Sequence, residues 1–196
     1  MRLDLTLIQD AIAPGSRVLD LGCGDGTLLR ALRDGKQVDG LGVEIDPDNI
    51  TYCISQGLSV VEQDLNQGLA NFESNSFDVV VMAYALQTLR YPHRVIDEML
   101  RIGRECIVTF PNFGHWRARW HLLWRGRMPV SRFLPYTWYD TPNIHFCTVR
   151  DFDALCRARQ VRVLARSVVA ADNSLSAPAR LLPNLFGMTA IYHIAR

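Results

Sequence analysis

The segment VLDLGCGDGTLL, residues 18–29, constrains the fold of this chain more than any other part of it. An apolar strand carries Asp20 near its end, and a loop with glycine at every second position leads into a helix that begins at Thr27. Such a turn needs residues that tolerate positive φ angles. Its glycines also let a ligand lie against bare backbone at the carboxyl end of a strand. The segment therefore predicts a nucleotide-binding turn of an α/β sheet.

The stretch from 17 to 110 alternates short apolar runs with helix-like segments, the pattern of parallel sheets built from strand, helix, strand units. The runs at 79–82 and 106–110 are apolar at successive positions, as strands covered on both faces are. Predicted strands cover Arg17–Leu21, Gly40–Ile45, Leu58–Gln63, Phe77–Met82 and Glu105–Phe110, and predicted helices cover Thr27–Arg33, Pro47–Gln56 and Pro92–Ile102. The predicted fold class is α/β, a doubly wound and mostly parallel Rossmann-like sheet.

Beyond the fifth predicted strand the pattern changes. Residues 111–147 are rich in Trp, Tyr, Arg and Pro, show no clear strand, and are predicted to be an insertion over the sheet. Thr148 with Asp151 three residues later resembles a capping box, with Asp in place of the usual Glu. This pair predicts a helix that runs through about Arg159.

Two β-prone runs follow, Val161–Val169 and Thr189–Ile194, separated by a Pro-containing connection. We expect them to pair antiparallel and to give the sheet an antiparallel C-terminal edge strand. At 196 residues, 48% of them apolar, the chain closes one substantial core and has little material for a second. Residues 1–196 are therefore predicted to form a single domain, with 111–147 as its insertion or cap.

Composition argues against several classes of partner. The net charge of +1 produces no long-range attraction to nucleic acid or to an anionic membrane. The five cysteines are scattered and never spaced as CxxC, which predicts no disulfide framework and fits a reducing cytoplasm. No apolar run approaches the roughly 20 residues of a membrane span. His145 and Cys147 lie two residues apart but lack further ligands at suitable spacing, so we expect no metal.

The spacing of the glycine loop indicates which nucleotide is bound. A dinucleotide fingerprint, GxGxxG, would require glycine at position 27, where this chain has Thr27, and the loop lacks the Lys of a triphosphate-binding loop. DLGCGDG instead resembles the first motif of class I S-adenosylmethionine-dependent methyltransferases. In that family an acidic residue faces the methionine amino group, and Asp20 occupies that position.

Carboxylates also stand at the ends of the second and third predicted strands. GVEID places Glu44 where the family binds the ribose, and VEQDL places Asp64 where the family's acidic residue accepts a hydrogen bond from the adenine amino group. The alternative is that both are helix N-cap or turn carboxylates. At the end of the fourth strand Tyr84 either faces the acceptor or packs under the next helix. The resemblance implies S-adenosylmethionine or S-adenosylhomocysteine as cofactor, bound by Asp20, Gly22, Cys23, Gly24, Gly26, Glu44, Ile45, Asp64, Leu65 and Ala83.

Within the insertion, Trp116, Trp120 and Trp124 recur at i, i+4 and i+8, so they share one face of a helix. One interpretation is that this face packs on the domain. The other is a contact surface, because Trp and Arg are enriched among the residues that dominate interface energies.

The sequences FPNFGHWRARWHLLWRGRMPVS and PYTWYDTPNIHFCTVRDF resemble the methionine biosynthesis family MetW, and the resemblance covers essentially the whole chain. It implies a bacterial cytoplasmic protein of methionine biosynthesis, often working with a homoserine O-acyltransferase.

Two functions follow from the resemblance. The first is methyl transfer to a small molecule or protein, with Tyr136, Tyr139, Asp140 and His145 as candidate catalytic bases by chemistry alone. The second is a non-catalytic accessory subunit that supports the acyltransferase. The sequence does not separate them, because they differ only in whether the insertion encloses an acceptor pocket or docks a partner.

Overall fold

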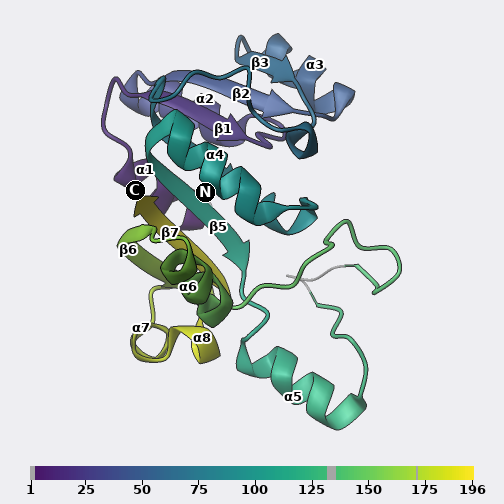
Figure 1. Ribbon diagram of the computed structural model, residues 1–196. Coiled ribbons are helices and arrows are strands. Elements are labelled where there is room, and N and C mark those ends of the chain that lie inside the picture. Colours follow the sequence, from purple (N-terminus) through teal and green to yellow (C-terminus); the bar gives the residue numbers. More distant parts are fainter. Residues whose placement is uncertain (1–2, 132–135, 171) are drawn as a thin grey trace.

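A single seven-stranded sheet organises the computed structural model, which describes residues 3–131, 136–170 and 172–196 (Figure 1). The strand order is β3-β2-β1-β4-β5-β7-β6, and the first five strands are parallel. β7 runs antiparallel to both of its neighbours, β5 and β6. The strands are β1 Arg17–Leu21, β2 Asp39–Glu44, β3 Ser59–Glu62, β4 Phe77–Ala83, β5 Gly103–Pro111, β6 Arg162–Val169 and β7 Thr189–Ala195.

Helices cover both faces of the sheet. Buried side chains of α1 and α2 pack on one face with Val18 and Val79, and those of α4 and α6 pack on the other with Leu19 and Val80. Figure 1 shows α4 and α6 on the near face of the sheet. The helices are α1 Leu3–Ala11, α2 Thr27–Lys36, α3 Pro47–Ser55, α4 Pro92–Ile102, α5 Trp116–Arg125, α6 Val149–Ala158, α7 Ala177–Leu181 and α8 Pro183–Phe186, with short 3₁₀ turns η1 Leu65–Gln67 and η2 Leu86–Thr88.

Local sequence signals set several of these boundaries. Proline is the first residue of α3 and of α4, where its missing N–H costs no helical hydrogen bond. The capping box predicted for α6 is present, because Thr148 and Asp151 exchange side-chain-to-backbone hydrogen bonds. The central strand β4 is buried at four successive positions, 79–82, as its continuous apolar run predicted.

The predicted α/β fold class is confirmed, and every predicted strand is present with ends shifted by two residues or fewer. The two C-terminal strands pair antiparallel as predicted. β6 forms the outer edge, and the antiparallel strand β7 lies one position inside it. The connection between them, predicted only as Pro-containing, includes the short helices α7 and α8.

The insertion forms helix α5, which lies apart from the sheet (Figure 1). No residue of α5 is buried, and the exposed fractions of Trp116, Trp120 and Trp124 are 40%, 57% and 70%. The interpretation that this face packs on the domain is therefore wrong for the described residues. The i, i+4 spacing correctly places the three rings on one face, but spacing carries no information about what covers that face. Residues 132–135 of the insertion lie outside the described residues.

The exposure of α5 leads to a prediction about stability. Trp120→Ala and Trp124→Ala should change the free energy of unfolding by about 0.5 kcal/mol or less, because neither ring fills core space. Phe152→Ala should lose about 3 to 5 kcal/mol, because Phe152 is fully buried among Phe110 and Tyr192. Urea unfolding followed by circular dichroism measures all three. A core-sized loss at either tryptophan would show that α5 packs on the domain.

Candidate functional site

The carboxyl ends of β1, β2 and β4 border a cavity of about 310 Å³, which we call the strand-end cavity. Ligands of open α/β sheets bind at these ends, where the connecting loops diverge. Six of the ten predicted cofactor-binding residues line the cavity: Gly22, Glu44, Ile45, Asp64, Leu65 and Ala83. The remaining four, Asp20, Cys23, Gly24 and Gly26, lie in β1 and the glycine loop that follows it.

The loop after β1 requires glycine for two different reasons. Gly22, Gly24 and Gly26 all have positive φ angles, of 75°, 55° and 69°. A Cβ atom at Gly26 would also collide with Leu58 and with the sulfur of Cys53. The loop is thus held against its neighbours by close packing as well as by backbone conformation.

Glu44 fastens this loop to the end of β2. Its Oε2 accepts a hydrogen bond from the N–H of Gly24 at 2.7 Å, and its Oε1 accepts from the N–H groups of Ile45 and Asp46 at 2.8 and 3.0 Å. A carboxylate has about four lone-pair sites, so these three bonds leave room for one more. Glu44 therefore fixes the backbone of the glycine loop and of the turn after β2, and it still borders the cavity.

Asp20 lies beneath the loop and is almost fully buried. Its Oδ1 has no hydrogen-bond partner among the described residues. Burial, with the nearby negative charge of Glu44, raises the pKa of Asp20 to about 7. A buried polar atom without a partner costs free energy, and such an atom beside a cavity is a candidate for contact with a ligand.

Asp64 combines the two roles that the sequence left open. Its Oδ1 accepts hydrogen bonds from the backbone and side-chain nitrogens of Asn66, at 2.9 and 3.0 Å, and so caps η1. The same residue lines the strand-end cavity. Glu44 is not the cap of α3, because Asp46 takes that position.

Cys23 does not line the cavity. Its side chain is buried under the glycine loop, where it packs against Gly42 and Cys53. Burial, with the charge of Asp20, raises the pKa of the Cys23 thiol, so this sulfur is uncharged and serves as packing material.

Tyr84 follows β4 with a φ angle of 61°, which is rare for a residue with a side chain. Its hydroxyl donates to Oδ2 of the buried Asp4 at 2.5 Å and lies 3.3 Å from Oγ1 of Thr189. The residue lines the strand-end cavity, but its polar end is bonded to α1. Tyr84 follows β4 as predicted, but its hydroxyl is bonded to residues of α1 and β7, which neither predicted alternative named. The sequence held no signal for a partner 80 positions away.

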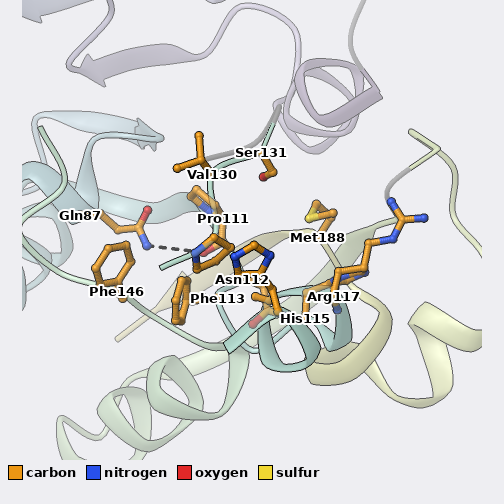
Figure 2. Close-up of a pocket in the computed structure, with 13 residues that line it drawn as sticks. Gln87, Pro111, Asn112, Phe113, His115, Arg117, Val130, Ser131, Phe146 and Met188 are labelled. Carbon is orange, nitrogen blue, oxygen red and sulfur yellow. Dashed lines mark hydrogen bonds between the residues drawn. The ribbon is translucent and has the colours of Figure 1, made fainter. Parts of the chain in front are cut away.

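A second cavity, of about 240 Å³, lies under the insertion and is called here the insertion cavity (Figure 2). Its apolar lining residues are Pro111, Phe113, Ala118, Pro129, Val130, Phe146 and Met188. The turn η2 borders both cavities, since Thr88 lines the strand-end cavity and Gln87 lines the insertion cavity. Sequence reasoning missed Gln87, which belongs to no motif.

The four candidate catalytic bases lie outside both cavities. Tyr136, Tyr139, Asp140 and His145 are exposed, and none of them lines the strand-end cavity or the insertion cavity. The side chain of His145 contacts the backbone instead, with its Nε2 3.3 Å from the carbonyl oxygen of Arg90. The structure therefore brings the cofactor-binding candidates together and leaves these four apart from them.

Neither a metal cluster nor a membrane span is found within residues 3–131, 136–170 and 172–196. No group of three or more His, Cys, Asp or Glu side chains there is arranged to hold a metal ion. No helix in the same ranges is long and apolar enough to cross a membrane.

Two curated relatives show what the chain resembles. It is 37% identical over 160 residues to the bifunctional methionine biosynthesis protein MetXA/MetW of Rhodopirellula baltica, a match to 77% of this chain and 26% of that protein. It is 33% identical over 108 residues to a ubiquinone biosynthesis O-methyltransferase of Hahella chejuensis, covering 53% of this chain and 45% of that one. The chain thus spans about a quarter of the first relative's length and under half of the second's.

Solved structures share the fold at low sequence identity. An S-adenosylmethionine-dependent methyltransferase of Mesorhizobium loti has a TM-score of 0.71 at 17% identity, covering 99% of this chain and 98% of that one. The [4+2]-cyclase SpnF has a TM-score of 0.66, also at 17% identity, covering 99% and 80%. These likenesses show that the fold is that of class I methyltransferases.

A family model extends the match to almost the whole sequence. The model described as "Methionine biosynthesis protein MetW" matches residues 2–194. The matched region contains the glycine loop, both cavities and the insertion. The chain therefore belongs to the MetW family of methionine biosynthesis proteins.

Proposed function

We propose that the chain binds S-adenosylmethionine in the strand-end cavity and transfers its methyl group to a small molecule or a protein. The observation that carries this proposal is the unpaired, buried oxygen of Asp20 beside a glycine loop, with carboxylates at the next two strand ends. These groups fit the ligand in kind, because its amino group, ribose hydroxyls and adenine amino group are all hydrogen-bond donors.

Each residue has a separate part in this proposal. Asp20 would accept from the amino group, the remaining lone pair of Glu44 would accept from a ribose hydroxyl, and Asp64 would accept from the adenine amino group beside the backbone of Leu65. When bound, S-adenosylmethionine supplies a methyl group already activated by its sulfonium charge. The main task left to the chain is then to align an acceptor with that group and to exclude water.

A second candidate function is that of an accessory subunit. Two observations favour it: the Rhodopirellula baltica relative carries MetXA and MetW in one bifunctional chain, and the tryptophan face of α5 is exposed. We propose that this face docks a homoserine O-acyltransferase. A [4+2]-cyclase shares the fold, so the fold alone does not establish methyl transfer. A function other than methyl transfer therefore stays a candidate.

The proposed cofactor site predicts how Glu44 variants behave. Glu44→Ala should weaken S-adenosylhomocysteine binding at least about tenfold, because it removes a charged acceptor from the ribose and releases the glycine loop. Glu44→Gln should also weaken binding. Both oxygens of Glu44 accept from backbone N–H groups, and the NH2 of glutamine would replace one of these acceptors with a donor. Glu62→Gln, at the exposed end of β3, is the matched control and should leave affinity unchanged. Isothermal titration calorimetry measures all three.

NAD is the control ligand for this site, because Thr27 replaces the third glycine of the dinucleotide fingerprint. At equal concentration it should fail to displace S-adenosylhomocysteine. Displacement of S-adenosylhomocysteine by NAD would contradict the assignment of this site to S-adenosylmethionine. An affinity for S-adenosylhomocysteine that Glu44→Ala leaves unchanged would contradict it as well.

The raised pKa of Asp20 predicts a pH dependence of binding. Only the ionised carboxylate attracts the ligand's ammonium, so affinity should rise between pH 5.5 and 8 and fall at most about tenfold for each pH unit below about 7. Asp20→Asn should bind weakly and lose this dependence. The facing groups are Glu44 and the thiol of Cys23, and the raised pKa of that thiol keeps it neutral over this range. A flat pH profile of the unaltered chain would exclude contact between Asp20 and the amino group.

The accessory candidate predicts that single tryptophan substitutions weaken complex formation. Trp116→Ala, Trp120→Ala and Trp124→Ala should include at least one that costs about 2 kcal/mol or more in affinity for the acyltransferase, because interface energy concentrates in a few anchors. Trp138→Ala is the matched control, since Trp138 is exposed in the same insertion but lies off α5. Co-purification that survives all three substitutions in folded variants would place the contact elsewhere.

A further inference from the structure

The insertion cavity has the size of a small-molecule site. A cavity of about 150 Å³ with apolar walls holds benzene. At about 240 Å³ the insertion cavity is larger, so it has room for a substituted ring or for two fused rings. Phe113, Phe146, Val130 and Met188 supply apolar surface around this volume (Figure 2).

Three buried polar side chains line the cavity, and one of them is fully engaged by the protein. The Nδ2 of Asn112 donates to the carbonyl of Gly187 at 2.7 Å, and its Oδ1 accepts from the N–H groups of Gly114 and Val149. Asn112 thus joins the end of β5 to α6 and to the residues after α8. Its polar atoms are used in the fold, so of these three buried side chains Gln87 and His115 remain for a ligand. His121 and Ser131 also line the cavity and are more exposed.

His115 presents one hydrogen-bond donor. Its Nδ1 accepts from the backbone N–H of Arg117 at 3.2 Å and caps α5, so in the neutral ring the proton resides on Nε2. Burial, with the charge of Arg117, lowers the pKa of His115, and the ring is neutral at pH 7. Its Nε2 makes no hydrogen bond to the described residues, although the exposed fraction of His115 is only 4%. This nitrogen is therefore available as a donor rather than as a base.

Gln87 presents an acceptor. The residue has an exposed fraction of 3%, and its backbone carbonyl accepts from the N–H groups of Ile144 and His145 at 2.8 and 3.1 Å, which anchors the insertion to η2. The side-chain Nε2 reaches only the carbonyl of Pro111, at 3.5 Å, and Oε1 has no partner among the described residues. Figure 2 shows Gln87 and His115 on either side of Pro111.

Charge narrows the class of ligand further. Among the described residues that line the insertion cavity there is no carboxylate, so none of them favours a cationic amine. The guanidinium of Arg117, an exposed residue of the same lining, lies 5.5 Å from the ring centroid of Trp116. An anion bound in the cavity would lose its hydrating water to apolar walls without gaining an ion pair from a buried side chain, so an anionic ligand is disfavoured.

We propose that the insertion cavity binds an uncharged ring compound, of about one or two rings, whose hydroxyl or carbonyl oxygen accepts a hydrogen bond from His115 Nε2. This inference rests on the proposed function in one respect: such a compound would be the methyl acceptor, held across η2 from the strand-end cavity. Binding itself requires only the insertion cavity.

The probe is 2-naphthol, compared with 2-methylnaphthalene, which has the same shape without the hydroxyl, and with 2-(aminomethyl)naphthalene, which is cationic. Calorimetry on the full chain saturated with S-adenosylhomocysteine should show one site for 2-naphthol and weaker binding of the other two. His115→Asn keeps a side chain that caps α5, but its shorter amide places no donor at the position of Nε2, so it should weaken 2-naphthol about 3- to 10-fold. The same variant should leave 2-methylnaphthalene unchanged.

Filling the cavity gives an independent test. Ala118 lines the insertion cavity from α5, so Ala118→Phe should abolish 2-naphthol binding, whereas Leu123→Phe on the exposed side of the same helix should not. Equal binding of 2-naphthol and 2-methylnaphthalene, or binding that survives Ala118→Phe, would overturn the proposal. Binding of 2-naphthol to a chain that fails to bind S-adenosylhomocysteine would refute the proposed function alone. The converse result, cofactor binding without 2-naphthol binding, would refute this inference alone.

Discussion

Three backbone N–H groups converge on the carboxylate of Glu44, and the geometry of the site depends on that convergence. One comes from the glycine loop after β1 and two from the turn that begins α3, so a single side chain joins the ends of neighbouring strands. Hydrogen bonds to a charged acceptor are stronger than those between neutral groups. The three bonds hold the loop in place without a ligand, and the loop follows directly after the strand that carries the second carboxylate, Asp20, whose Oδ1 has no partner among the described residues.

The fold and the strand-end cavity were predictable because they depend on local patterns. A parallel sheet brings the carboxyl ends of its strands to one edge, so residues 20, 44 and 64 are expected near that edge once the strands are located. The contacts that the sequence did not reveal join distant segments. Tyr84 reaches Asp4 across 80 positions, and the carbonyl of Gln87 holds the insertion more than 50 positions later. No spacing rule encodes such pairs.

The insertion also shows what a local sequence pattern leaves undetermined. Its helical period gave the shared face of three tryptophans, but whether a face is covered depends on the whole fold. In the structure, Ala118 and Arg117 of α5 line the insertion cavity, while Trp120 and Trp124 of the same helix are exposed. The two candidate functions therefore use different surfaces of one helix and do not compete for the same atoms.

The side of α5 that lines the insertion cavity and the side that carries the exposed tryptophans belong to the same helix, so neither can move without the other. A protein bound to the tryptophan rings would contact α5 on its exposed side, and another side of α5 borders the insertion cavity. If binding at one proposed site shifted the helix, the other site would change as well, and thermodynamic reciprocity requires any such change in affinity to be the same in both directions. Helix α5, ten residues with none of them buried, would then be the element that links occupancy of the cavity to the surface.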